Sequence, residues 1–407
     1  MHLAAAYVLA DTAYAGSAEF ANRVELRGRD TQGAAGVDAV DVPSAHVGVS
    51  TRRWDYLLDY SAVAMLPDLQ LGVSPQLLQI GDLGATWRSH RVKIGLTEYG
   101  TYGQENSGYL IGGPSTTVGQ PTPTAPVGGG TQLVAPPATV NYGSSRTVLA
   151  SQLVVSRRWG ATASVEYLMQ GGIDAASRAY LPFVTGPRAD ATATYALTRV
   201  DGLETRVSAL ESSATSGACS PAALDVPAGA LCDPSAQEAI GTETWRHRLT
   251  RSWQLAAGAG ASVLRGRLRD VDAYRTFVFP VGSTSIEHAT GPVDDRRVIR
   301  LEALVAPVLD VRIGILDERA QTSLDVSQRW GETRLTARVA GARSIYSPLV
   351  QPATIFQSAV DVEVALSKVT SVGGGVRYLW QDQGNLGIFS GGFVFAGVTV
   401  RTPELHF

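Results

Sequence analysis

Residues 359–367, AVDVEVALS, alternate between apolar and polar side chains. Val360, Val362 and Val364 share one parity, whereas Asp361 and Glu363 share the other. Successive side chains of a strand point to opposite faces, so this pattern collects the charges on one face, whereas helical spacing would spread them around the axis. The segment is predicted to be a β-strand with one apolar and one wet face.

The same alternation recurs along the chain. It is clearest at residues 298–305 and 333–342, where Leu335, Ala337 and Val339 oppose Arg334 and Arg338. It is noisier at residues 22–27, 55–64, 91–97, 161–170, 189–198, 204–210, 253–264, 320–328 and 372–380. Because no comparable amphipathic helix occurs, an all-β fold is predicted.

Composition narrows the class of all-β protein. Charged residues make up 17% of the 407 positions, below the roughly 25% of ordinary soluble domains, so Ser, Thr, Gln and Gly supply much of the polarity. The nearest apolar-rich run, Ile388 to Val400, is too short for a spanning helix, which excludes helical membrane proteins. A multi-domain soluble β protein and an outer-membrane barrel remain. The balance of 34 basic against 37 acidic residues gives no reason to expect a nucleic-acid partner.

The connections between the strands favour the barrel. Tight connections are predicted at 50–54 (STRRW), 87–90, 156–160 (SRRWG), 200–202, 250–253, 327–331 and 367–371. Long connections rich in Gly, Pro, Ser and Thr are predicted at 103–144, 171–188, 214–240, 266–295 and 344–355. Short turns at one rim and long loops at the other are typical of outer-membrane barrels.

Tryptophan placement supports the same interpretation. Five of the seven Trp residues lie in or beside the tight turns, and Trp245 lies a few residues before the turn at 250–253. Indole is enriched where apolar chain meets water. An interfacial girdle is therefore predicted at one rim, and the alternative is a repeat whose turns use Trp for packing. Its members are Trp54, Trp87, Trp159, Trp245, Trp253 and Trp330.

Counting hairpins gives about 18 strands in a transmembrane antiparallel up-and-down β-barrel, and 16 is the alternative because the turn near Pro307 is indistinct. Barrels of this size leave an aqueous lumen. Residues 16–407 are predicted to form this single barrel, with long outer loops 103–144, 214–240 and 266–295. Residues 1–15 are interpreted as a signal-peptide remnant or an N-terminal extension, since Ala13-Tyr14-Ala15 resembles a cleavage site but no basic segment precedes it.

These residues together resemble the Gram-negative outer-membrane porin-type β-barrels over nearly the whole chain, which ends in Phe407 as those proteins typically do. Pro403 and His406 interrupt the terminal pattern. The resemblance implies a bacterial outer-membrane location, with outer-membrane lipid and the barrel-assembly machinery as partners. The Trp-and-Arg turns and the strand number are also similar to exopolysaccharide-secretion barrels, which implies periplasmic secretion components and a polysaccharide as further partners.

In such a barrel the polar parity faces the lumen, and ion pairs are expected between neighbouring strands. Asp325 is expected beside the strand of Arg334 and Arg338, and Arg338 beside the strand of Asp361 and Glu363. The expected function is a water-filled passage, most simply the exit of an exopolysaccharide secretion system, with a general diffusion porin as the alternative and a barrel enzyme or adhesin as the remaining classes. The predicted lumen-lining residues are Arg246, Arg248, Glu302, Arg312, Asp325, Arg334, Arg338, Asp361 and Glu363.

Other chemistry is sparse in the sequence. Cys219 and Cys232 are the only cysteines, and an oxidising compartment favours one disulfide between them. No histidine lies near them, so no metal site and no cofactor are predicted. His288 is predicted to lie in a long loop near Asp294 and Asp295, but no serine elbow accompanies it, and no enzymatic activity is expected. Loop 103–144, with six prolines and nine glycines, is interpreted as a pore constriction or a mobile outer loop.

Overall fold

The computed structural model describes residues 13–31, 34–69, 75–106, 139–215, 235–267, 274–292, 295–310, 315–346, 354–382 and 388–406. Its strands form one sheet. They are β1 (Ala13–Thr31), β2 (Ala34–Thr51), β3 (Trp54–Leu66), β4 (Gln76–Arg88), β5 (Val92–Asn106), β6 (Thr139–Val154), β7 (Trp159–Gly172), β8 (Phe183–Ala196), β9 (Asp201–Thr215), β10 (Ser235–Arg248), β11 (Trp253–Arg267), β12 (Tyr274–Thr290), β13 (Arg297–Asp310), β14 (Ile315–Trp330), β15 (Thr333–Tyr346), β16 (Thr354–Ala365), β17 (Thr370–Asp382), β18 (Ile388–Arg401) and β19 (Leu405–His406).

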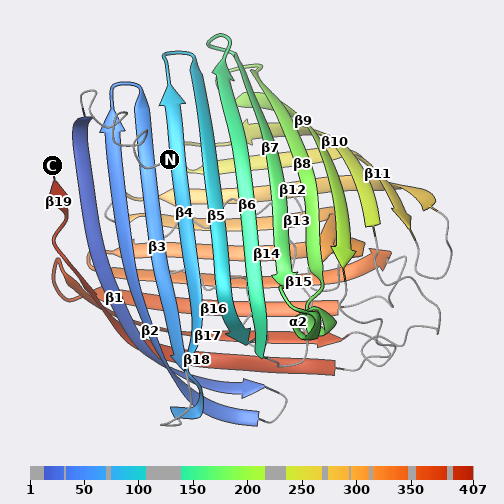
Figure 1. Cartoon of the computed structure of the whole chain (residues 1–407). Coiled ribbons are helices and arrows are strands. Elements are labelled where there is room, and N and C mark those ends of the chain that lie inside the picture. Colours follow the sequence, from blue (N-terminus) through green and yellow to red (C-terminus); the bar gives the residue numbers. More distant parts are fainter. Residues whose placement is uncertain are drawn as a thin grey trace, which may run out of the picture.

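The long strands β1 to β18 close into a barrel. Each is antiparallel to its neighbour in the chain, and β18 pairs with β1 from Ala21 opposite Arg401 to Thr31 opposite Gly391. The two-residue β19 adds to β1 beyond the end of β18. Figure 1 shows the strands running side by side around the barrel, with the start of β1 and the end of β18 at the same rim. The predicted all-β transmembrane barrel of about 18 strands is confirmed.

The tight turns share one hydrogen bond. In six of them a Ser or Thr hydroxyl accepts from the backbone N–H three residues later, as Thr51 does from Trp54 (2.9 Å) and Ser156 from Trp159 (3.1 Å). Small hydroxyl residues favour turns because they can satisfy a backbone donor locally. This bond explains the recurring Ser/Thr-initiated composition of the turns. The other four pairs are Ser89–Val92, Thr198–Asp201, Thr250–Trp253 and Ser367–Thr370.

The strand ends that the longer connections join lie at the opposite rim. The connection between β7 and β8 contains the short helix α2 (Ala175–Tyr180), and the 3-10 turn η1 (Pro67–Leu69) follows β3. Asp174 caps α2 by accepting from the Ser177 N–H at 2.8 Å. No helix within the described ranges is long and apolar enough to cross a membrane. Much of loops 103–144 and 214–240, with Cys219 and Cys232, lies outside the described residues.

Two sequence predictions are corrected by the structure. The segment predicted as an outer loop at 266–295 contains β12, which pairs with β11 along Trp253–Arg267. In contrast, the count of 18 strands included a separate strand at 309–317 after the indistinct turn near Pro307. That turn does not occur, because Pro307 lies inside β13, and the expected strand divides between the end of β13 and the start of β14. The two errors cancel in the strand count.

Proline explains why β12 escaped detection. The pairing between β12 and β13 covers Gly282–Thr290 against Arg297–Val305, and Pro280 and Pro307 lie just beyond it on their strands. Within the described residues, Pro280 therefore has a ladder partner only on β11, and Pro307 only on β14. Proline is tolerated where one side of a strand is unpaired, because it lacks the N–H that a second ladder needs.

Candidate functional site: the inner wall of the barrel

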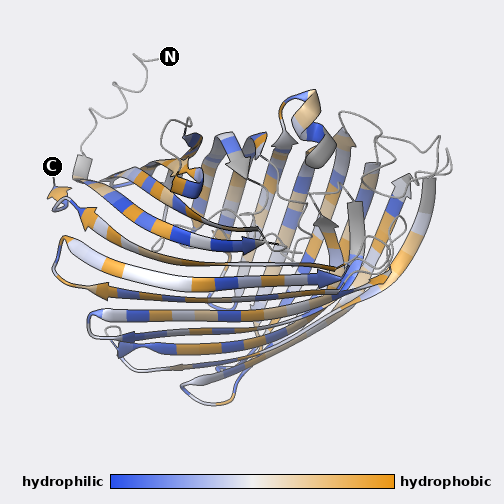
Figure 2. Ribbon diagram, turned by 90° about the horizontal axis from the view of Figure 1, so that it is seen from below, coloured by the Kyte–Doolittle hydropathy of each residue, from blue (hydrophilic) through white to orange (hydrophobic). Residues whose placement is uncertain are grey.

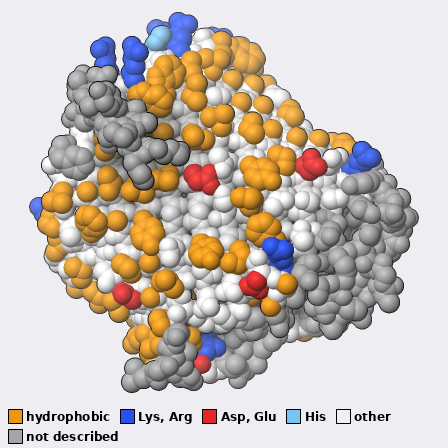
Figure 3. All heavy atoms as spheres, viewed as in Figure 1, with side chains coloured by type: hydrophobic (Ala, Val, Ile, Leu, Met, Phe, Trp, Pro, Cys, Tyr) orange, Lys and Arg blue, Asp and Glu red, His pale blue; other side chains and the backbone are white. Residues whose placement is uncertain are grey.

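The two parities of each strand separate into an outer apolar wall and an inner polar wall. On β16, Val360 and Val362 are about two-fifths exposed on the outside, whereas Asp361 and Glu363 point to the other side and form ion pairs with arginines. Figure 2 shows hydrophobic and hydrophilic residues alternating along the strands, and the outer face in Figure 3 is largely hydrophobic. The candidate functional site is therefore the inner wall.

A buried carboxylate organises the inner wall beside the closure of the barrel. Glu25 on β1 is 2% exposed and lies between Arg23, whose Nη2 is 2.7 Å from its Oε2, and Arg27, whose Nε donates to its Oε1. These residues are two apart on one strand, so they share the inner face. A carboxylate in this position needs both cations, because burial without a partner is costly.

Aromatic rings support the same arginines. The guanidinium of Arg27 lies 5.9 Å from the ring centroid of Phe393, and that of Arg377 lies 5.6 Å from Phe393 and 5.9 Å from Phe395. Arg377 also reaches Asp361 at 3.8 Å. We call Arg23, Glu25, Arg27, Asp361, Arg377, Phe393 and Phe395 the seam cluster, because it covers the inside of the β1–β18 junction. Its cation–π contacts hold the arginines against the wall.

A further ion-pair group extends the β1 row. Arg29 Nε donates to Asp38 on β2 at 3.2 Å, and Arg29 Nη2 donates to Asp68 in η1 at 2.6 Å. Asp38 also accepts from the Asp68 backbone N–H at 2.7 Å. These contacts tie η1, at the rim opposite the tight turns, to the inner wall.

A second cluster lies on β6 to β9. Arg146 and Glu166 pair at 2.7 Å. Asp190 accepts from Arg188 (2.7 Å) and from Arg206 (2.8 Å). As in the seam cluster, each arginine finds a carboxylate within the wall, although three arginines share two carboxylates.

Nearer the tight-turn rim the pairs are more exposed. Arg246 contacts Glu204 at 2.7 Å, Arg300 contacts Glu302 at 2.9 Å, and Arg338 contacts Asp325 at 3.5 Å. The Arg338 and Asp325 side chains are 57% and 42% exposed. Their exposure on the inner face indicates a hydrated wall, where such pairs contribute about 0–1 kcal/mol each.

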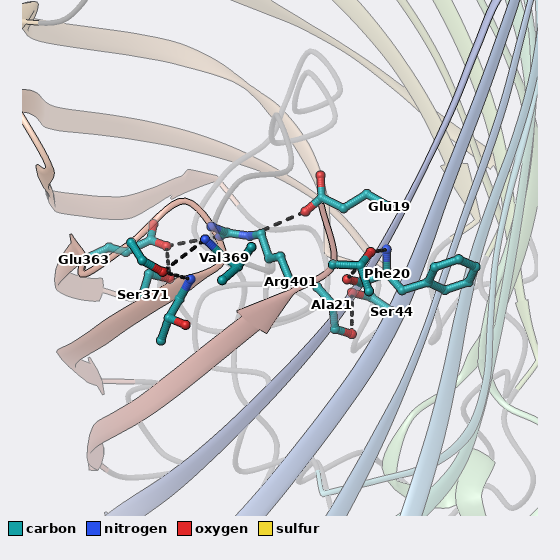
Figure 4. A network of polar contacts seen from close by, with 11 residues as sticks. Glu19, Phe20, Ala21, Ser44, Glu363, Val369, Ser371 and Arg401 are labelled. Atoms are coloured by element: carbon teal, nitrogen blue, oxygen red, sulfur yellow. Dashed lines mark hydrogen bonds and ion pairs between the residues drawn. The ribbon is translucent and has the colours of Figure 1, made fainter. Parts of the chain in front are cut away.

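Arg401 links strands on both sides of the barrel closure. Its Nη2 donates to Glu363 on β16 at 3.2 Å, and its Nε lies 3.6 Å from Glu19 on β1. Ser371 on β17 donates to the same Glu363 oxygen at 2.8 Å. Figure 4 shows Arg401 between the two carboxylates, with Glu19 and Phe20 on opposite sides of β1.

The wall also holds an acidic row on β2 to β4. His46 Nδ1 lies 2.5 Å from Asp59, and Asp59 is the cross-strand neighbour of Asp82. No group of three potential metal ligands is found within the described ranges. Asp59 and Asp82 therefore give this part of the wall a local negative charge, and His46 is a direct contact of Asp59.

The predicted lumen residues occupy the inner parity wherever the structure describes them. Asp325 meets Arg338 as expected, but Asp361 and Glu363 pair with Arg377 and Arg401 rather than with Arg338. Near the tight-turn rim, Arg248 lies opposite Gln254 and Arg334 lies opposite Glu363. Arg312 lies outside the described residues.

Some inner residues were not predicted from the sequence. The alternation of residues 161–170 was the sequence signal that could have placed Glu166 on the inner face. The other residues missed there lie on the polar parity of their strands and are Arg146, Arg188 and Asp190. Phe393 and Phe395 gave no such signal, because they are apolar residues on the inner parity of β18.

The tryptophans of the predicted girdle lie near the tight-turn rim. Trp54 and Trp87 are direct cross-strand neighbours on the outer face. Trp253 packs against His288, with ring centroids 4.3 Å apart and the ring planes tilted by 32°. His288 is therefore in β12, and its predicted position in a long loop is wrong. Five residues of the girdle are between 38% and 48% exposed, namely Trp54, Trp159, Trp245, Trp253 and Trp330.

Some outer-face carboxylates depart from the apolar rule, among them Glu98 and also Glu243, which shares its parity with Trp245. Glu98 on β5 accepts hydrogen bonds from Ser145 (2.6 Å) and Thr147 on β6. These hydroxyls satisfy its oxygens within the wall, which reduces the cost of placing a carboxylate beside lipid.

Comparison with known proteins gives one family match and several structural likenesses. Among solved structures, the chain is similar to Pseudomonas aeruginosa OpdK with vanillate (8% identity, TM-score 0.49, covering 95% of this chain and 99% of that one). It is also similar to OccK2 (OpdF) of the same organism (9%, 0.46, 95% and 98%) and to the FrpB iron transporter of Neisseria meningitidis (9%, 0.49, 94% and 82%). No curated protein matches the chain.

The family match covers residues 8–273, which include β1 to β11, under the description "EpsX exopolysaccharide export family". The closed barrel and this match point to a channel of the outer membrane. Because the match spans well over half of the chain, the chain belongs to the EpsX exopolysaccharide export family.

Proposed function

We propose that the barrel is the outer-membrane exit through which a secreted exopolysaccharide leaves the cell. The observation that carries the proposal is the family match over residues 8–273. The assignment would make a polysaccharide the cargo and periplasmic secretion components the partners. The barrel-assembly machinery would insert the protein into the outer membrane.

The charge arrangement of the inner wall supports a neutral or weakly charged polymer. Arg188 and Arg206 share Asp190, and Arg23 and Arg27 share Glu25, so each of these groups keeps one excess positive charge. The acidic row of Asp59 and Asp82 carries the opposite sign, and the exposed pairs are balanced one to one. A wall whose charges are paired internally has little field with which to hold a charged cargo. A hydrated polymer can slide along such a wall without strong binding.

A blocking experiment tests this proposal inside the cell. Ser323 faces the lumen, between Glu302 and Ala340, whereas its neighbour Thr322 faces outward. In a background with C219S and C232S, S323C treated with a bulky thiol reagent should lower polymer secretion, and T322C should not. Unchanged secretion despite complete labelling of S323C would refute the exit role.

The alternative is a general diffusion porin, favoured by the exposed Arg338 and Asp325 pair. Planar bilayers separate the two functions. A diffusion porin gives stable open conductance by itself and its deletion reduces small-solute uptake, whereas deletion of an export barrel reduces secreted polymer and leaves solute uptake intact.

A further inference from the structure

The tight-turn rim is strongly basic. The eight tight connections between β2 and β17 contain nine basic residues and three acidic ones in the sequence. The longer connections of the opposite rim contain three basic and six acidic residues. The nine, which we call the basic rim, are Arg52, Arg53, Arg91, Arg157, Arg158, Arg199, Arg251, Arg296 and Lys368.

The turn geometry places these side chains at the tips. In each of the six hydroxyl-capped turns, the two residues between the Ser/Thr and the N–H it accepts from include a basic residue, such as Arg53 between Thr51 and Trp54. All nine basic-rim residues are exposed, and none forms an ion pair with any residue that the structure describes. Figure 3 shows Lys and Arg side chains projecting from the upper rim. This charge is therefore available to a partner.

The neighbouring tryptophans identify the partner. Arg53, Arg158 and Arg251 come one or two residues before Trp54, Trp159 and Trp253, each of which begins a strand on the outer face. Indole side chains settle at the boundary between hydrocarbon and headgroups. The arginines beside them then lie at the depth of the lipid phosphates.

We infer that the basic rim binds the anionic headgroups of glycerophospholipids, such as phosphatidylglycerol, in the leaflet that faces the periplasm. Short turns face the periplasm in barrels of this type. The basic residues surround the barrel, in seven of the eight turns, as a lipid annulus does. A polyanion entering the lumen would instead need the charge concentrated on the inner side. The inference does not depend on what passes through the barrel.

The test compares lipid retention by three variants of the full chain. The rim variant is R53Q/R158Q/R251Q, its charge-retaining partner is R53K/R158K/R251K, and the control R246Q/R300Q/R338Q removes three charges from the inner wall. Each barrel is purified from an equimolar mixture of phosphatidylglycerol and phosphatidylcholine, and bound lipid is counted by native mass spectrometry. Heat-modifiable gel mobility confirms that each variant is folded.

The wild-type chain should retain phosphatidylglycerol over phosphatidylcholine by about fivefold or more. A single basic residue near an anionic surface is expected to strengthen lipid binding by about that factor. The preference should fall severalfold in the rim variant, which keeps six of the nine basic residues, and should approach equality at high salt. It should persist in the lysine variant and the control. A wild-type chain without preference, or a rim variant that keeps it, would overturn the inference. Loss of polygalacturonate binding in neutral-lipid nanodiscs with unchanged lipid preference would assign the rim to a polyanion instead.

Discussion

Arg401 on β18 reaches over β17 to Glu363 on β16, with 3.2 Å between its Nη2 and the carboxylate Oε1. The same guanidinium lies 3.6 Å from Glu19 on β1, across the junction where the first and last long strands meet. One side chain therefore ties together strands on both sides of the closure. Ladder hydrogen bonds join only adjacent strands, so this contact adds a connection that they cannot make.

Replacing Arg401 should weaken the closure. R401Q is expected to lower the free energy of unfolding by about 1 kcal/mol, since the groups are partly exposed and the charged hydrogen bonds are partly screened. Urea unfolding in detergent, followed by Trp fluorescence, measures the change. E363Q is the matched partner in a double-mutant cycle, and strictly additive losses would contradict a direct interaction.

Glu25 should be more sensitive than any exposed carboxylate of the wall. E25A leaves Arg23 and Arg27 without their shared partner in a buried setting, where removing one member of an ion pair costs about 3 kcal/mol or more. E302A is the control, because its pair with Arg300 is exposed. Equal unfolding midpoints for the two variants would show that burial does not govern the seam cluster.

Alternation predicted the fold because every strand of a barrel has one side in lipid and one side in a wet lumen. The same rule places Asp325, Asp361 and Glu363 on the inner wall by their parity alone. It could not predict which arginine each would meet, because ion pairs depend on register and on side-chain reach. Glu363 lies opposite Arg334 on the neighbouring strand, yet Arg401 is the residue that contacts it.

The rule failed where chemistry and parity disagree. Phe393 and Phe395 are apolar but face inward, where the guanidinium of Arg377 lies over both rings and that of Arg27 lies over Phe393. β12 was missed because Pro280 breaks the pattern of a central strand, and it is accommodated where only one ladder exists. Both exceptions depend on neighbours that are distant in sequence.

Gly375 should tolerate no side chain. An added Cβ would lie 2.5 Å from the Asp361 carboxylate, 2.5 Å from the Val360 carbonyl and 2.8 Å from the Phe395 ring. G375A is expected to destabilise the barrel by about 1–3 kcal/mol through overpacking of the seam cluster. Gly28 is the matched control, because a Cβ there meets nothing within 4 Å. Heat-modifiable mobility on gels compares the two, and a G28A loss as large as that of G375A would refute the steric explanation.

The Asp174 cap should make the α2 connection sensitive to acid. Hydrogen bonds from the Ser177 backbone, then from the Asn141 side chain, lower the pKa of Asp174 below its usual value. A carboxyl with a depressed folded-state pKa stabilises the fold above its unfolded pKa of about 3.9 and loses that contribution as pH falls below it. Hydrogen exchange at the Ser177 amide should therefore accelerate, beyond its intrinsic pH dependence, as the pH falls through that range.

The variant D174A supplies the comparison for that experiment. Its Ser177 amide should exchange rapidly at neutral pH and show no further acid-induced loss of protection. Protection that persists in D174A would mean that the cap does not order this connection.

The exposed pair of Arg338 and Asp325 should set the local potential of the lumen rather than its stability. Ser323 lies next to Asp325 on the inner face, with its hydroxyl 3.5 Å from the carboxylate, and so provides a reporter position. In S323C, with the native cysteines replaced by serine, R338Q leaves Asp325 without its cation. The ratio of labelling rates for cationic over anionic thiol reagents should then rise by about twofold, the size expected for one unit charge in a wet environment. D325N should shift the ratio in the opposite direction, while neither substitution changes the unfolding midpoint by more than a few tenths of a kcal/mol. Shifts of the same sign would exclude an electrostatic origin and would mean that the substitutions alter access to the lumen instead.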